Sequence, residues 1–158
     1  MPATDAHLYR AIINGTFEND ELVKEGRPVV GVLYPRFEST RYVDRQGIER
    51  VSGPDVTVQK APGGDEVDAG GGTSMFTVPG WFGFVGWSYF HVPVGTPYPD
   101  CLFIKRGKSL RTNRSGTLKS PHYQIEPKNR MTVEAYKGAL DTFARCAVVE
   151  QIKLAKGK

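Results

Sequence analysis

The last third of the sequence decides the fold, and residues 121–156 read PHYQIEPKNRMTVEAYKGALDTFARCAVVEQIKLAK. Pro121 and Pro127 bound the run 122–126, in which polar and apolar side chains alternate. Successive side chains of a strand point to opposite faces, so this run predicts a strand with His122, Gln124 and Glu126 on one face. A strand with one polar and one apolar face is suited to line a cleft.

The residues after this strand predict a long helix from about Val133 to Lys156. Thr132 stands where a side-chain N-cap is expected, and Glu134 lies in the first turn, where a carboxylate interacts favourably with the helix dipole. Apolar residues at helical spacing predict a face that packs against the core, namely Tyr136, Leu140, Phe143, Ala147 and Ile152. We expect this helix to support the core and to carry no chemistry.

Upstream, 18 glycines and 11 prolines divide the chain into short elements. The expected strands cover residues 7–13, 29–33, 56–60, 73–78, 89–92 and 102–104. A short helix is expected at 16–24, and loops are expected at 62–72 and 105–119, the second of them mobile and basic. The pattern predicts an α+β fold in one domain, residues 1–158, because a chain of this length leaves too little sequence for a second core.

Charge is divided unevenly along the chain. Residues 1–100 carry 8 Lys and Arg against 13 Asp and Glu, whereas residues 101–158 carry 13 against 4. The segment 105–119 holds six of these basic residues and no acid, and it is either a solvated surface segment or a flap that faces phosphates. A basic C-terminal third indicates an anionic partner, which could be a nucleotide, a nucleic acid or an acidic protein.

The sequence contains no run of the roughly 20 apolar residues that a membrane span requires. Its first residues show neither the basic leader nor the apolar run of a secretory signal. If the protein leaves its cell, we therefore expect a route that does not read such a signal. Cys101 and Cys146 are expected to be reduced thiols, and the cysteines and histidines lack zinc-binding spacing.

Three short motifs carry the candidate site residues. Arg10 lies in an apolar strand, where its guanidinium needs either a structural ion pair or an anionic ligand. Thr73 and Ser74 follow a glycine-rich loop, either as turn caps or as hydroxyls that face a ligand. His122 begins its strand as either a structural side chain or a ligand contact. The aromatic run 81–87 is either core packing or a wall beside a ligand pocket.

Four separated blocks carry a resemblance that covers residues 7 to 157. They are Leu8-Tyr9-Arg10-Ala11, Gly71-Gly72-Thr73-Ser74-x-Phe76, His122-Tyr123-x-Ile125-x-Pro127 and Leu140-Asp141-x-Phe143-x-Arg145-x-Ala147. With these blocks in this order, the chain resembles ADP-ribosyltransferase-like toxins and, more narrowly, the family of the type VI secretion exported toxin Tse-two.

The resemblance implies a compact ADP-ribosyltransferase-like fold, with short twisted strands around a cleft and a long C-terminal helix. It also implies an NAD-dependent toxin that modifies a macromolecule in the cytoplasm of a target cell, and a cognate immunity protein that binds it. By position, the implied catalytic residues are Thr73, His122 and Arg10. The residues implied to bind NAD are Arg10, Thr73, Ser74, His122 and Tyr123.

Two other functions remain open from the sequence. A ribonuclease would use histidines as acid and base while the basic segment follows phosphates. A non-catalytic toxin would block its target by binding alone. The Glu-x-Glu motif of arginine-specific transferases is absent, and Glu126, on the His122 face, is the candidate for the electron-rich group that a transferase needs.

Overall fold

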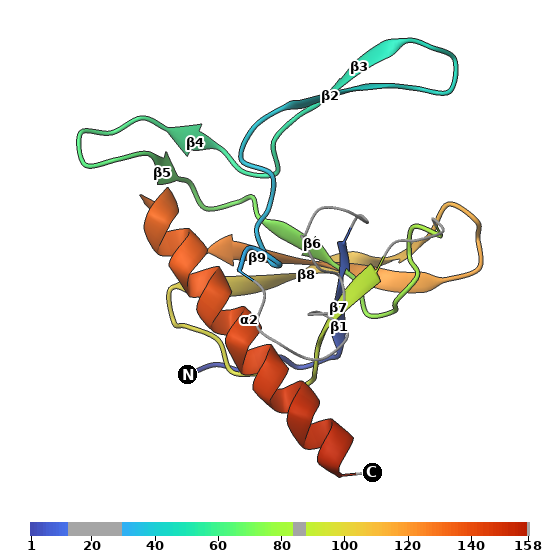
Figure 1. Cartoon of the computed structure of the whole chain (residues 1–158), viewed down its shortest axis with the longest axis vertical. Coiled ribbons are helices and arrows are strands. Elements are labelled where there is room, and N and C mark those ends of the chain that lie inside the picture. The colour runs from blue at the N-terminus through green and yellow to red at the C-terminus, as the bar shows by residue number, and fades with distance from the viewer. Residues whose placement is uncertain (13–29, 84–87, 158) are drawn as a thin grey trace.

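The computed structural model describes residues 1–12, 30–83 and 88–157 (Figure 1). Short strands and a long C-terminal helix make up an α+β fold, as predicted. Its elements are β1 (Leu8–Ile12), β2 (Thr40–Val43), β3 (Glu49–Ser52), β4 (Val58–Gln59), β5 (Glu66–Val67), β6 (Thr73–Met75), β7 (Ser88–Val92), β8 (Leu102–Thr112), β9 (Lys119–Pro127), β10 (Met131–Thr132) and α2 (Val133–Lys156). None of the helices among these residues has both the length and the apolar character needed to cross a membrane.

The strand that contains His122 lies at the centre of an antiparallel sheet with the order β6-β9-β8. In its register, Ser74 of β6 stands opposite Gln124 of β9. A second pair, β1 with β7, meets this sheet where Tyr9 and Phe76 exchange backbone hydrogen bonds of 2.7 and 3.2 Å. Arg10 of β1 and Ser74 of β6, 64 residues apart in sequence, are therefore neighbours.

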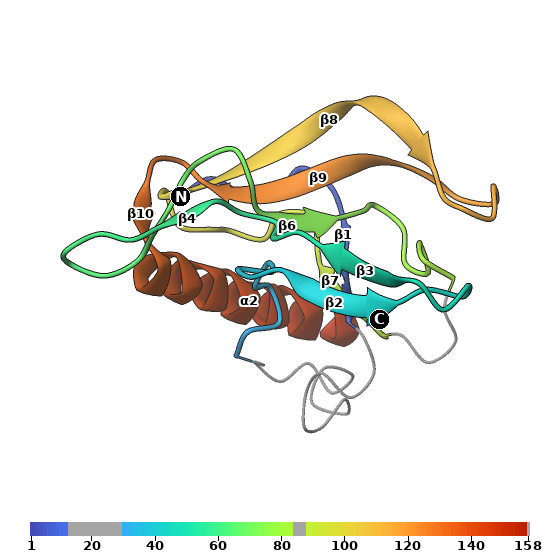
Figure 2. The same ribbon diagram turned by 90° about the horizontal axis from the view of Figure 1, so that it is seen from above.

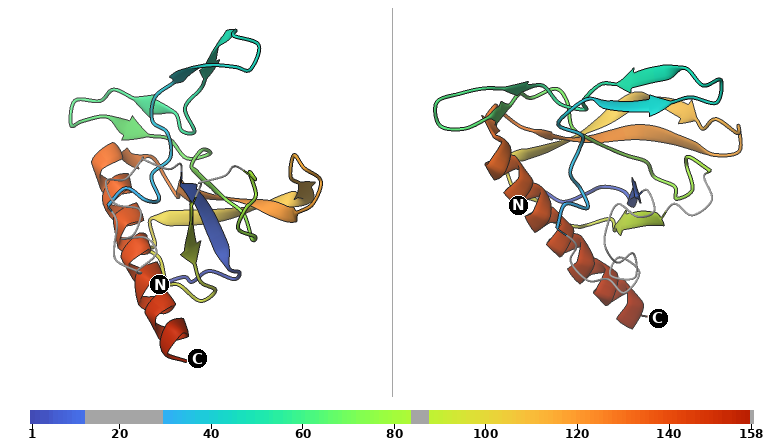
Figure 3. Two further views of the ribbon diagram at one scale, coloured as in Figure 1. Left: turned by 45° about the vertical axis from the view of Figure 1, so that its right-hand side comes forward. Right: turned by 45° about the horizontal axis from the view of Figure 1, so that its top comes forward.

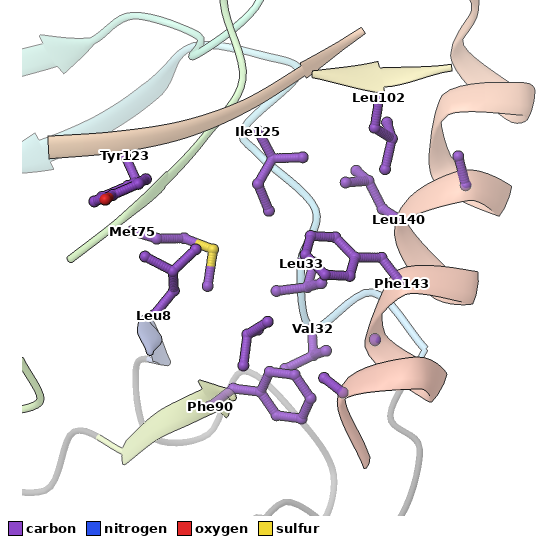
Figure 4. Close-up of a cluster of buried hydrophobic side chains, with 14 of the residues drawn as sticks. Leu8, Val32, Leu33, Met75, Phe90, Leu102, Tyr123, Ile125, Leu140 and Phe143 are labelled. Carbon is purple, nitrogen blue, oxygen red and sulfur yellow. The ribbon is translucent and has the colours of Figure 1, made fainter. Parts of the chain in front are cut away.

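Helix α2 covers the apolar side of the sheet, as the view from above shows (Figure 2). Tyr136, Leu140 and Phe143 are fully buried there, and the Tyr136 hydroxyl donates a 2.7 Å hydrogen bond to the carbonyl of Ile125. Figure 4 shows this core, in which Leu8 and Met75 from β1 and β6 face side chains of the helix. The predicted helix bounds and the Thr132 cap are confirmed, since the Thr132 hydroxyl accepts from Ala135 N at 3.1 Å. Ile152 was wrongly assigned to the buried face and is 44% exposed, because the last turns of α2 extend past the sheet.

Two predictions about segments before residue 73 are wrong. Residues 30–33 form a turn and not a strand, because Gly31 adopts a φ of 86° and Tyr34 N bonds back to its carbonyl. The loop predicted at 62–72 contains β5, which pairs with both β4 and β10 and buries Val67 completely. The helix expected at 16–24 and the start of the 29–33 strand lie outside the described residues.

The third error concerns the basic segment 105–119, which was predicted as a loop. Most of it is strand, because β8 runs to Thr112 and β9 begins at Lys119. Asn113 closes the turn between them: its side chain accepts from Leu118 N at 3.0 Å and donates to the carbonyl of Trp81 at 3.2 Å. The resulting hairpin reaches away from α2 to the far side of the molecule, while the β2–β3 ribbon stands apart from the sheet (Figure 3).

Candidate functional site

Strand alternation divides the predicted site residues between two faces of the β6-β9-β8 sheet. Ser74 and His122 lie on the face away from the core, and the Nε2 atom of His122 is 2.9 Å from the Ser74 hydroxyl oxygen. Thr73 and Tyr123 point to the opposite face, toward α2. The sheet therefore brings Ser74 and His122 together and separates them from their sequence neighbours.

Arg10 approaches Ser74 from the side of β6 that is not paired with β9. Its guanidinium donates to the backbone carbonyls of Ser74 and Tyr34, each at 3.1 Å. Burial lowers the pKa of Arg10 from its usual value, while the nearby carboxylate of Asp55 acts in the opposite direction. Ser74 thus contacts Arg10 through its carbonyl and His122 through its hydroxyl, which makes it the central residue of the cluster.

Thr73 is completely buried, and its hydroxyl donates a 2.5 Å hydrogen bond to the carbonyl of Leu33. The preceding residue, Gly72, leaves no room for a side chain, because a Cβ atom there would overlap the carbonyl of Ile125 on β9. Both features hold β6 close to its neighbours and thereby fix where Ser74 lies. Thr73 has no exposed surface in this conformation.

Asp141 on α2 holds the segment that supplies the Leu33 carbonyl to Thr73 and the Tyr34 carbonyl to Arg10. Its carboxylate accepts from Gly31 N at 3.0 Å and from the Tyr34 hydroxyl at 2.7 Å. Burial and this hydrogen bond raise the pKa of Tyr34 to about 12. The turn is therefore tied to the helix while its carbonyls face Thr73 and Arg10, a supporting role for Asp141 that sequence reasoning missed.

Tyr123 lies in the hydrophobic core with 4% of its surface exposed (Figure 4). Burial raises the pKa of its hydroxyl, and Asp5 adds to the effect. Its ring lies on the opposite face of β9 from His122, so it anchors the strand on which His122 stands.

Aromatic side chains border the His122 side of the sheet. The ring of Phe76 lies 5.6 Å from that of His122, and Trp81 stacks on Phe76 with 4.2 Å between centroids. Phe82 contacts Phe76 edge-on and remains 42% exposed. The described part of the aromatic run is thus both core packing, through Trp81, and a wall beside His122; residues 84–87 of the run lie outside the described residues.

A cavity of about 240 Å³ opens beside His122, lined by Lys105, Gly107, Arg111, His122 and Gln124. Burial lowers the pKa of His122, and the charge of Arg111 adds to this effect, so the imidazole is neutral at neutral pH. Two cations and a neutral imidazole favour an anionic ligand with hydroxyl groups. Lys105 and Arg111 were not predicted as site residues, because the segment that carries them was expected to be a loop.

A larger cavity of about 470 Å³ lies elsewhere, between the β4–β5 hairpin and the start of α2. Its lining includes the carboxylates of Glu38, Asp65 and Glu134 and only one cation, Lys137. Carboxylates repel phosphates, so the smaller basic cavity is the better site for a nucleotide. Within the described ranges, no three His, Cys, Asp or Glu side chains gather where they could hold a metal ion.

The fold is of the ADP-ribosyltransferase class, because the sequence model of a family of such toxins matches residues 9–152. The chain belongs to the Tse2 ADP-ribosyltransferase toxin family. This confirms the predicted resemblance to the Tse-two toxins, and the matched range includes all five residues predicted to bind NAD. No curated protein sequence matches the chain significantly.

Proposed function

We propose that this toxin transfers ADP-ribose from NAD+ to a macromolecule of a target cell, with NAD+ bound on the His122–Ser74 face of the sheet. The observation that carries the proposal is the 2.9 Å contact of His122 with Ser74 at the edge of a basic cavity. Membership of an ADP-ribosyltransferase toxin family supplies the type of reaction. Neutral His122 has one donor and one acceptor nitrogen, and since Nε2 contacts Ser74, Nδ1 is left for a ribose hydroxyl.

The cavity can hold only part of NAD+, because its volume of about 240 Å³ is below the roughly 300 Å³ at which pockets for drug-sized ligands begin. Lys105 and Arg111 are suited to the diphosphate, since both present exposed cations at the cavity. Apolar surface for the nicotinamide side comes mainly from Phe82, which is 42% exposed and packs edge-on against the buried ring of Phe76. Arg10 does not contact NAD+ in this proposal; it positions Ser74 by donating a hydrogen bond to its backbone carbonyl.

NAD+ supplies a ribose–nicotinamide bond whose cleavage opens the ribose carbon to a nucleophile of the acceptor. In this proposal, Ser74 and His122 orient the ribose through its hydroxyls. Gln124, opposite Ser74 in the register, donates to the carboxylate of Glu126 at 2.8 Å, and this fixes its amide beside the cavity. Glu126 is 7% exposed and lies about 13 Å along the strand from His122, so its part in this proposal is to hold the side chain of Gln124.

Thr73 and Tyr123 are positioning residues in this proposal rather than direct contacts of NAD+. Thr73 holds β6 against the carbonyl of Leu33, and Tyr123 anchors β9 in the core. Loss of either side chain would displace Ser74 or His122. The direct contacts that the resemblance implied for both residues remain the alternative, and the Thr73 variants described in the Discussion distinguish the two.

The toxin acts in the cytoplasm of the cell that receives it, after delivery by a secretion system that reads no signal peptide, such as type VI secretion. A cognate immunity protein binds and silences it in the producing cell. The resemblance to Tse-two toxins supports these parts of the proposal.

The test is a search for an ADP-ribose adduct. A target-cell lysate is incubated with the protein and biotin-labelled NAD+, and labelled macromolecules are identified by mass spectrometry. We expect labelling by the wild type and by Lys128→Gln, an exposed cation outside the cavity, and none by a folded His122→Asn variant. RNA cleavage without NAD+ would favour the ribonuclease instead, and full toxicity of His122→Asn would favour a toxin that acts by binding alone.

A further inference from the structure

The β8–β9 hairpin carries a concentration of positive charge that the binding of NAD+ does not account for. We call residues 105–119 the basic arm: the outer part of β8, the turn and the first residue of β9. Its basic residues are all exposed, namely Lys105, Arg106, Lys108, Arg111, Arg114 and Lys119. From residue 102 to residue 125 the sequence contains no Asp or Glu, so the arm has no acid of its own.

No cation of the basic arm forms an ion pair with another described residue. Ion pairs among the described residues use Arg36, Arg41, Arg50, Arg130 and Lys153. Along β8 alone, residues 105–112 extend on the order of 20 Å, which is long enough to meet several consecutive phosphates. Like charges at this density repel one another unless an anion lies along them.

The side chains between the cations favour a nucleic acid over an acidic protein. Hydroxyls of Ser109, Thr112, Ser115 and Thr117 are exposed on the arm, and such groups commonly donate to phosphate oxygens. A protein interface usually has an apolar centre, whereas the arm exposes only one large apolar side chain, Leu110. Phe103, 48% exposed and two residues before Lys105 on the same face of β8, offers a ring on which a base can stack.

We propose that the basic arm docks a single strand of nucleic acid and leads it to the cavity at His122. Lys105 and Arg111 belong to both the arm and the cavity lining, so a strand that follows the arm reaches the Ser74–His122 pair. In the proposed function this cavity of about 240 Å³ holds part of NAD+, so a strand that follows the arm reaches the edge of the cavity, beside the bound NAD+. This inference rests on the proposed function, for which it names the class of acceptor.

The test measures binding without NAD+, by fluorescence anisotropy of a labelled 20-nucleotide RNA and of a DNA with the same sequence. The arm variant is Lys108→Gln with Arg114→Gln, both outside the cavity lining. The matched control is Arg41→Gln with Arg45→Gln on the β2–β3 hairpin, which is also exposed. Affinity is measured between 50 and 300 mM salt, and a fluorescent polyglutamate peptide serves as the acidic-protein probe.

We expect the logarithm of the binding constant to fall linearly with the logarithm of the salt concentration. Each phosphate contact on a single strand contributes about 0.7 to the magnitude of this slope. The slope of the arm variant should therefore be smaller in magnitude by about 1.4, and the slope of the control variant should equal that of the wild type. Binding of RNA alone or of DNA alone supports the inference and identifies the strand. Equal slopes for the two variants, or tighter binding of polyglutamate than of either strand, would overturn it. Calorimetry with NAD+ on the arm variant tests the proposed function separately, since Lys108 and Arg114 lie outside the cavity.

Discussion

Replacement of Thr73 by valine separates a structural role of this residue from a direct role in the reaction. Valine has nearly the same shape as threonine, so Thr73→Val removes the 2.5 Å hydrogen bond to Leu33 and creates little empty space. The carbonyl of Leu33 then loses this donor in a site where Thr73 is completely buried and Leu33 is 1% exposed. The loss of the partner of a buried polar group costs about 1–3 kcal/mol.

For a chain of this size, that cost corresponds to a melting temperature lower by about 3–9 °C. Equilibrium unfolding in urea, followed by tryptophan fluorescence, measures the free energy directly. Thr73→Ser keeps the hydroxyl and loses one buried methyl group, so it should cost about 1 kcal/mol. Thr57→Val is the surface control, because Thr57 is exposed.

Binding of NAD+ to the same variants, measured by calorimetry well below their melting temperatures, completes the experiment. If Thr73 only positions β6, folded Thr73→Val retains binding, with an affinity reduced by less than about tenfold. A Thr73→Val protein that is as stable as the wild type but has lost all NAD+ binding would refute the reasoning, because the hydroxyl would then contact the ligand itself.

Three further predictions follow from the geometry of the site and of its supports. Ser74→Ala removes the hydroxyl that contacts His122 and should weaken NAD+ binding about tenfold, measured by calorimetry, with little change in the melting temperature. Gly72→Ala should destabilise the fold by about 1–3 kcal/mol in urea unfolding, because its Cβ meets the Ile125 carbonyl, whereas Gly63→Ala, with open space around it, should cost much less. Burial lowers the pKa of both His91 and His122 in the folded chain. As the pH falls through about 6.5, the ordinary pKa of histidine, the unfolded chain therefore binds protons that the folded chain does not yet bind. Stability should therefore be complete above about pH 6.5 and fall as the pH drops below it; a melting temperature unchanged from pH 7.5 to 5.5 would contradict this.

Local patterns predicted the parts of the fold that depend on short-range physics. Helix α2 and the strand with His122 were predicted from apolar periodicity and from the flanking prolines, because both signals lie within the elements themselves. The turn at residues 30–33 was mistaken for a strand because its apolar residues are buried as a strand's would be, with Val32 at 2% and Leu33 at 1% exposure. Only the positive φ of Gly31 and the tether to Asp141 distinguish the two, and neither is visible in the local sequence.

The candidate site was predicted only in part, because local patterns do not show which strands pair. Alternation along 122–126 was enough to group His122 with Gln124, but their position opposite Ser74 depends on a pairing of strands about 50 residues apart. Thr73 was predicted to be catalytic and Ser74 only to bind NAD, whereas the pleat of β6 turns the Thr73 hydroxyl into the core and the Ser74 hydroxyl toward His122. Lys105 and Arg111 join the site only because the basic segment folds back as a hairpin beside β9.

The central claim is that NAD+ binds where His122 meets Ser74, and calorimetric titration of NAD+ tests it most directly. The proteins compared are the wild type, His122→Asn and Lys128→Gln, each shown to be folded by its melting temperature. We predict measurable heat of binding for the wild type and for Lys128→Gln, and none for His122→Asn. Equal heats from all three proteins, or no heat from the wild type, would contradict the account.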